Sequence, residues 1–178
     1  MWRPLIFRRK IGLSAGMTPI TDCIIEDPRW DAFGLGALAE TAAQATLAAL
    51  GLAARGRQIA VLACDDARIS TLNADFRGKA RPTNVLSWPS ADRSAATPGA
   101  LPDPPQGATE LGDIAIAWET CAQEAADQGK TMQAHVTHLV VHGILHLLGF
   151  DHIDDADAAL METTEARILA SIGIADPY

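Results

Sequence analysis

Five histidines fall in a short window between residues 135 and 152. An α-helix turns about 100° per residue, so the first four of them would project at roughly 0°, 300°, 340° and 20° around the axis. These four are His135, His138, His142 and His146. The spacing therefore predicts a stripe of imidazoles along one narrow face of a helix.

A metal site can be built from part of this stripe. His142 and His146 lie one helical turn apart, about 6 Å along the axis, so both can bind one ion. Gly149 can adopt the left-handed conformation that ends a helix and reverses the chain, which would bring His152 back over the same face. The pattern HxxxHxxGxxH then supplies three ligands, His142, His146 and His152. Three protein ligands leave a fourth position for water, which is typical of a catalytic metal site.

The two remaining histidines, His135 and His138, are not expected to bind this ion. His138 lies about 12 Å along the helix from His146, too far for both to bind the same ion. We expect His138 to support a ligand or to contact substrate, including RNA, with a packed or capping histidine as the alternative. For His135 the expectation is a packed histidine.

Nearby acids and one glycine narrow the reaction class. Metalloproteases with this ligand spacing place a glutamate directly after the first histidine as general base, and here that position is Gly143. A peptidase would therefore lack its base. Asp151 could orient a ligand imidazole or serve as a turn residue. Asp154 and Asp155 are expected to cap the following helix.

A second dense patch is the run LNADFRGKARPTNVLSWP, residues 72–89. It holds Arg77, Lys79 and Arg81 with no acid between them, whereas the chain as a whole carries a formal net charge of −8. That charge excludes a broad cationic surface for nucleic acid, so contact with a polyanion would be concentrated here. A guanidinium can bind a phosphate through two hydrogen bonds. The alternative is an ordinary solvated basic loop.

Length and composition indicate one globular domain. The chain has 178 residues, of which 48% are hydrophobic and 20% charged, and this excludes a disordered chain. We find no apolar run of the roughly 20 residues needed for a transmembrane helix. The cysteines Cys23, Cys64 and Cys121 are far apart and form no CxxC pair, which is typical of reduced thiols in a cytoplasmic protein.

Residues 1–16 do not fit a secretory signal, because their basic residues follow the apolar run. We interpret them as a flexible N-terminal extension or as the product of a start codon assigned too early, with the domain occupying residues 17–178. Hydrophobic periodicity and stop signals predict strands at 20–26, 58–63, 84–88 and 111–117, and helices near 35–50, 119–127, 131–148 and 155–171. A further helix is expected to begin at a cap, Asp65 or Asp66, and to carry the apolar stripe Ile69, Leu72 and Phe76. The Pro- and Gly-rich stretch 90–110 is expected to be a mobile surface loop. This order predicts an α+β domain with a small mixed four-stranded sheet and about five helices.

Four segments together resemble one family. They are HGILHLLGFDH at 142–152, the run at 72–89, LGDIAI at 111–116 and Asp176-Pro177-Tyr178. They are similar to the YbeY family of bacterial endoribonucleases, also called rRNA maturation factors, over about residues 18–178. The resemblance implies a single domain similar to the zinc peptidases, with one zinc ion per chain held by His142, His146 and His152. It also implies that Arg77 matches the arginine taken as essential for RNA cleavage.

The same resemblance implies a zinc-dependent, single-strand-specific endoribonuclease. Its expected roles are late-stage 70S ribosome quality control and maturation of the 3′ end of 16S rRNA. The implied partners are the small ribosomal subunit with its rRNA and proteins and an Era-type GTPase, in the cytoplasm and with no membrane. Lys79 and Arg81 are expected to contact neighbouring phosphates. Two alternatives stay open: a non-catalytic ribosome-assembly factor stabilised by its metal, and a metallopeptidase. Phe76 and Phe150 depart from the family by standing where tyrosine is common.

Overall fold

A computed structural model describes residues 18–107 and 109–178, so the interpretation of residues 1–16 lies outside the described part. Within those ranges the chain forms a single α+β domain with a four-stranded sheet, as the sequence predicts, and it has six helices where about five were expected. The elements are β1 (Thr21–Ile25), α1 (Arg29–Phe33), α2 (Leu35–Ala49), β2 (Arg57–Cys64), α3 (Asp66–Arg77), β3 (Val85–Pro89), β4 (Thr109–Ala117), α4 (Trp118–Asp127), α5 (Met132–Leu147) and α6 (Asp155–Ser171).

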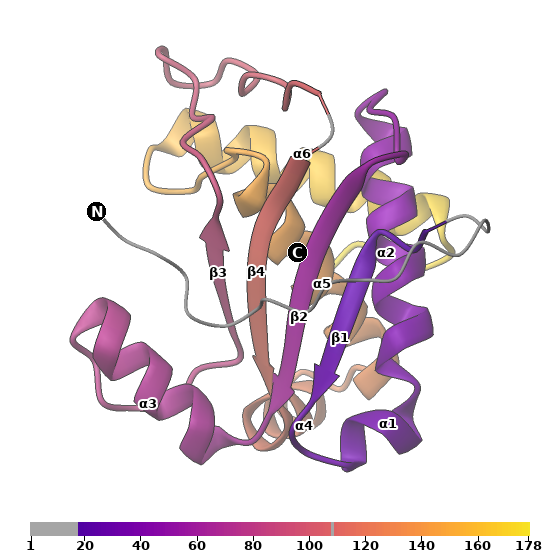
Figure 1. Ribbon diagram of the computed structural model, residues 1–178, viewed down its shortest axis with the longest axis vertical. Coiled ribbons are helices and arrows are strands. Elements are labelled where there is room, and N and C mark those ends of the chain that lie inside the picture. The colour runs from indigo at the N-terminus through magenta and orange to yellow at the C-terminus, as the bar shows by residue number, and fades with distance from the viewer. Residues whose placement is uncertain (1–17, 108) are drawn as a thin grey trace.

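The sheet is mixed and has the order β1-β2-β4-β3 (Figure 1). The first three strands in that order run parallel, and β3 pairs antiparallel with β4 at the edge. Successive side chains of a strand point to opposite faces, so β4 contributes to two cores. Ile114 and Ile116 belong to the main core with α2 and α5, whereas Ala115 and Ala117 pack with Ile69 of α3.

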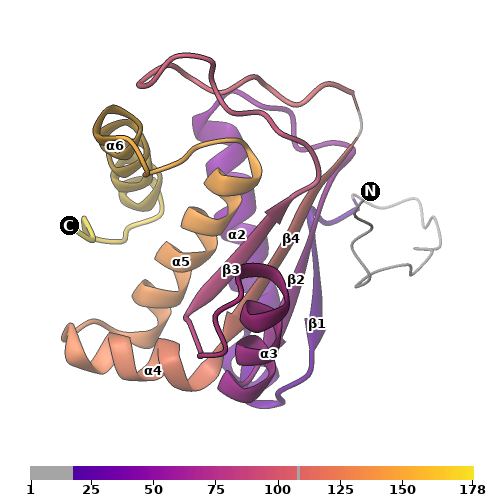
Figure 2. The ribbon, with the colours of Figure 1, turned by 90° about the vertical axis from the view of Figure 1, so that its left-hand side faces the viewer.

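The two faces of the sheet therefore carry different helices. α2 and α5 cover one face, α6 lies outside α5, and α3 packs against the other face (Figure 2). α5 carries most of the histidines and α3 leads into the basic loop, which we define as residues 77–81. α5 and α3 thus lie on opposite faces of one sheet, and the basic loop leads from α3 to the edge strand β3.

The structure differs from the sequence prediction in one additional helix and in the start of one strand. α1 was not predicted, and it adds a sixth helix that follows Pro28 and buries Trp30 completely. β4 begins at Thr109, so residues 109 and 110 belong to the sheet and not to the loop. Residues 90–107 contain neither helix nor strand, as expected. No helix in the described part combines the length and the apolar character needed to span a membrane.

Candidate metal centre

α5 leaves His142 and His146 accessible on one side because its opposite side is apolar and packs against the sheet. The helix begins after Thr131, whose hydroxyl accepts a hydrogen bond from the backbone N–H of Ala134 at 3.1 Å. Val140 and Ile144 are fully buried in the main core. His142 and His146 remain half-buried on the rest of the helix surface. Packing against the sheet thus fixes which side of α5 is left for ligand binding.

A glycine ends α5 and returns the chain. Gly149 has a φ of +95°, and a Cβ atom there would lie 2.6 Å from the carbonyl carbon of Arg93, so only glycine fits. Phe150 then packs into the core, and its backbone N–H donates to the carbonyl of Leu145 at 3.0 Å. This turn brings His152 back over the helix, as the sequence predicts.

The three histidines converge. We call His142, His146 and His152 the histidine triad. Their ring centroids are separated by 4.6 Å for His142 and His146, 5.3 Å for His142 and His152, and 4.9 Å for His146 and His152. One ligand nitrogen from each ring lies within 4.8 Å of the other two. The arrangement has the spacing of three donors around one metal ion.

The hydrogen bonds of the triad aim these nitrogens. His142 Nδ1 contacts Glu165 Oε1 at 2.7 Å, and His146 Nδ1 contacts the carbonyl of Phe150 at 3.0 Å. Since a carboxylate and a carbonyl only accept, both Nδ1 atoms carry the proton and both Nε2 atoms offer lone pairs. These Nε2 atoms face each other at 3.1 Å. Burial and the neighbouring His142 and His152 lower the pKa of His146 to about 4, which keeps it neutral at pH 7.

Two facing lone pairs repel each other unless a cation lies between them, so the triad fits a bound metal. Neutral imidazole is a good ligand for zinc, copper and nickel, and the tied Nδ1 atoms match the outer contacts that orient such ligands. A site of three histidines also keeps one coordination position open.

Sequence reasoning did not identify Glu165, the carboxylate behind the triad. Glu165 on α6 is fully buried, and it accepts hydrogen bonds from His142, from His138 Nε2 at 3.2 Å and from the hydroxyl of Tyr178. Burial alone would raise its pKa, but the bonds from His138, His142 and Tyr178 outweigh burial and hold the pKa well below its usual range. The sequence signal was an acid beside Thr164 on the buried side of an amphipathic helix.

The other two histidines, His138 and His135, have different hydrogen-bond partners. His138 shares Glu165 with His142, so it supports a ligand from behind, and its contact with RNA stays a prediction. His135 is 3% exposed and its Nε2 atom lies 2.8 Å from Glu124 Oε2. It is a packed histidine remote from the triad.

The nearby acids are structural. Asp151 accepts a hydrogen bond from the backbone N–H of His152 at 2.7 Å, so it shapes the turn, and in the described part no hydrogen bond joins it to an imidazole ring. Asp154 caps α6 by accepting from the N–H of Ala156 at 2.9 Å. Gly143 faces the sheet, where a Cβ atom would lie 3.0 Å from Cδ1 of Ile114. The position that holds a general base in metalloproteases is therefore packed against the sheet.

The long loop holds the end of the metal-binding helix through Arg93, which the sequence analysis also missed. Arg93 is 8% exposed, and its guanidinium donates to the carbonyl of Leu147, the last residue of α5, at 3.0 Å. A cation is favourable there because of the helix dipole. Further along, the N–H of Gly99 donates to Asp157 of α6 at 2.7 Å. The expected mobile loop is thus attached to both helices of the site.

The basic loop is open to solvent. Arg77, Lys79 and Arg81 are exposed, and within the described ranges the guanidinium of Arg77 has no hydrogen-bond or ion-pair partner. The backbone is nevertheless ordered, since Asn73 Nδ2 donates to the carbonyl of Arg81 at 2.9 Å. No hydrogen bond or ion pair in the described part joins the basic loop to the histidine triad. The loop leads into β3, which forms one edge of the sheet.

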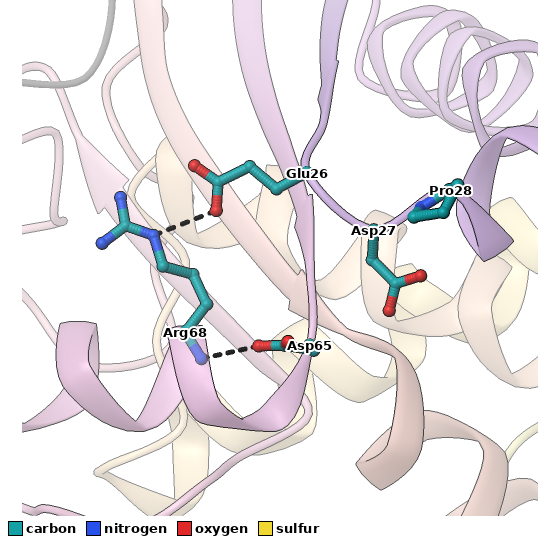
Figure 3. A pocket seen from close by; sticks show the side chains of 5 residues that line it. All are labelled: Glu26, Asp27, Pro28, Asp65 and Arg68. Atoms are coloured by element: carbon teal, nitrogen blue, oxygen red, sulfur yellow. Dashed lines mark hydrogen bonds and ion pairs between the residues drawn. The ribbon is translucent and has the colours of Figure 1, made fainter.

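A pocket of about 390 Å³ lies where β1 and β2 end (Figure 3). Its charges are paired internally. Arg68 Nε lies 3.0 Å from Glu26, the backbone N–H of Arg68 donates to Asp65 at 2.7 Å, and Arg29 holds Asp27. Each of the four charged side chains that line this pocket thus already has a hydrogen-bond or ion-pair partner.

All three cysteines are free thiols, as expected, and lie away from the triad. Burial raises the pKa of Cys23 to about 11 and that of Cys64 to about 12, and it raises the pKa of Cys121 further. These thiols stay protonated at neutral pH.

Comparison with known proteins gives matches along almost the whole chain. The family model described as Endoribonuclease YbeY matches residues 25–173. The protein named Endoribonuclease YbeY of Cereibacter sphaeroides is 57% identical over 167 residues, which cover 91% of this chain and 100% of that protein. The one of Jannaschia sp. is 59% identical over 157 residues, covering 88% and 98%. The solution structure of TM1509 from Thermotoga maritima matches with a TM-score of 0.52 at 20% identity, over 85% of this chain and 91% of that one, which supports the fold.

Proposed function

Because this chain belongs to the YbeY family of endoribonucleases, we propose that it is a zinc-dependent endoribonuclease that cleaves single-stranded RNA. The observation that carries the proposal is the histidine triad, in which three ligand nitrogens lie within 4.8 Å of one another. Two of the rings have their Nδ1 atoms tied to acceptors, so their Nε2 atoms are available to the metal. Zinc bound there would supply Lewis acidity and a coordination position for a nucleophilic water.

The protein's own groups would do the rest of the work. His142, His146 and His152 would hold the metal, and water could reach the site because His152 is exposed. Arg77, with no partner in the described part, can bind a phosphate through two hydrogen bonds. An RNA strand that contacts both Arg77 and the triad would pass around the β3 edge, and Lys79 and Arg81 would bind neighbouring phosphates.

We assign the biological role from the family in the same way. The substrate would be the 3′ region of precursor 16S rRNA and the setting late-stage 70S ribosome quality control in the cytoplasm. Small-subunit ribosomal proteins and an Era-type GTPase would be the partners. The net charge of −8 supports a substrate that is presented by such an assembly, because binding to isolated RNA rests on one local basic patch.

Cleavage of a labelled RNA that carries the 3′ region of the small-subunit precursor tests this proposal. The protein is assayed as purified, after removal of metal by a chelator, and after restoration of one equivalent of zinc. We expect cutting by the first and third preparations, loss of cutting in the second, and protection of RNA annealed to a complementary strand. A zinc-loaded protein that cuts nothing beyond the stripped preparation would contradict catalysis and favour the assembly-factor alternative. Cleavage of unfolded protein in place of RNA would favour a peptidase.

A further inference from the structure

We propose that the segment after α6 is a positioning element for the metal centre, acting through Tyr178 on Glu165 and through Glu165 on His142. The inference rests on the proposed zinc site and goes beyond it. It assigns a role to Tyr178, which lies 31 positions beyond the end of the helix that carries His142 and His146.

The segment is held in place by several contacts. The carbonyl of Pro177 accepts a hydrogen bond from Lys130 Nζ at 2.9 Å, and the backbone N–H of Tyr178 donates to Asp176 at 3.1 Å. The ring of Tyr178 stands edge-on to that of His138, with centroids 5.8 Å apart. Tyr178 is 63% exposed, yet its hydroxyl donates to the fully buried carboxylate of Glu165.

The two oxygens of Glu165 have separate tasks. Oε1 accepts from His142 Nδ1 at 2.7 Å, while Oε2 accepts from Tyr178 and from His138. Donors on both oxygens fix the plane of the carboxylate. That plane sets the direction of the bond from Nδ1 and so the orientation of the His142 ring, whose Nε2 atom faces the metal position.

Loss of the tyrosine hydroxyl would weaken this arrangement specifically. Oε2 would keep only the His138 contact, which at 3.2 Å is the longest of the three. The carboxylate would then rotate more freely and orient His142 less tightly. Because most of Tyr178 is exposed, its ring contributes little to the core, and the loss of folding stability should come only from one fewer donor to the buried carboxylate. The larger effect should appear in metal binding.

Metal binding without RNA tests the inference. The variants are Tyr178→Phe, Glu165→Gln and the double variant. The control is Glu162→Gln, which makes the same chemical change at an exposed position of α6. The dissociation constant for Zn²⁺ is measured by competition with a chromophoric chelator. The visible spectrum of the Co²⁺-loaded protein and thermal unfolding of the metal-free protein are recorded on the same samples.

We expect Glu165→Gln to weaken zinc binding by about 10- to 100-fold, as is usual for outer contacts of metal ligands. Tyr178→Phe acts one step further out and should weaken it about three- to tenfold, with an altered Co²⁺ spectrum and a smaller loss of folding stability than Glu165→Gln. Because the two residues act in series, Tyr178→Phe should add less than about twofold in the Glu165→Gln background. Glu162→Gln should bind like the wild type.

Two results would overturn the inference: Tyr178→Phe that binds zinc as tightly as the wild type, or an equal effect of Tyr178→Phe with and without Glu165. Wild-type protein that binds zinc in this assay but cuts no RNA would overturn the proposed nuclease function and leave the inference standing. Wild-type protein that binds no zinc would overturn both.

Discussion

The histidine triad and the basic loop contain the two kinds of group that phosphodiester cleavage needs, and the protein holds them in opposite ways. In the triad His142 and His146 are half-buried and their Nδ1 atoms are bonded to Glu165 and to the carbonyl of Phe150, and Arg93 of the long loop holds the end of their helix. The basic loop is exposed, and Arg77 has no partner in the described part. A metal site needs donors fixed before the ion arrives, whereas a guanidinium that binds a phosphate must be left unpaired. The comparison teaches that metal binding and phosphate binding can be changed separately.

The largest effect is expected from His152→Ala. Removal of one of three ligands should reduce bound zinc from about one per chain to near zero, because two imidazoles alone bind weakly. His152 is exposed, so the metal-free protein should unfold as the wild type does. Metal analysis after dialysis measures the loss. His135→Gln is the control, and equal zinc loss by this packed histidine would show that the triad is not the site.

Gly149→Ala should be the most disruptive change that removes no ligand. The new Cβ would lie 2.6 Å from the backbone of Arg93 at a φ of +95°, so we expect a loss of at least about 2 kcal/mol in the free energy of unfolding. Urea unfolding of the metal-free protein measures it. Gly173→Ala is matched, because φ there is +76° with nothing within 4 Å of the added atom. Equal losses for the two variants would mean that the contact with Arg93 does not constrain the turn.

Acid should destabilise the metal-free protein through His146. Its pKa falls from 6.5 to about 4 on folding, so between these values the unfolded chain binds the proton more readily than the folded one. This contribution to stability is present above pH 6.5 and is lost as the pH falls toward 4. The difference in unfolding free energy between wild type and His146→Gln, measured from pH 7 to pH 4, should shrink accordingly. A difference that stays constant over this range would contradict the burial of a neutral His146.

The smallest effect is expected from Lys79, in the middle of the basic loop. Lys79→Ala should weaken RNA binding modestly and reduce the slope of log affinity against log salt concentration by about 0.7, the value for one phosphate contact on a single strand. Zinc content and unfolding should be unchanged, because Lys79 is exposed. Fluorescence titrations at several salt concentrations give the slope. An unchanged slope would remove Lys79 from the RNA-binding surface.

The sequence allowed prediction of features with a strict period or a special residue. Helical spacing placed His142 and His146 on one face, and Gly149 marked the turn that returns His152. Strand and helix patterns predicted the strands of the mixed sheet and five of the six helices in the described part. The short α1 after Pro28 was not predicted. Each of these depends on neighbours within a few residues.

The supports of the site depend on contacts between distant segments, which no local pattern encodes. Glu165 lies 23 positions from His142, and Arg93 lies 54 positions from Leu147. In sequence, Glu165 looks like one more acid on an amphipathic helix and Arg93 like a solvated loop cation. The packing of α3, which leads into the basic loop, against the face opposite α5 is equally non-local.

The most direct test of separate metal and phosphate sites measures zinc content and RNA cleavage on the same preparations of wild type, His146→Ala and Arg77→Ala. We predict that His146→Ala loses both zinc and cleavage. Arg77→Ala should keep about one zinc and unfold within about 0.5 kcal/mol of the wild type, since it is an exposed residue, while cleavage falls by about 100-fold or more. Arg77→Ala that cuts RNA at the wild-type rate, or that loses its zinc, would contradict the account.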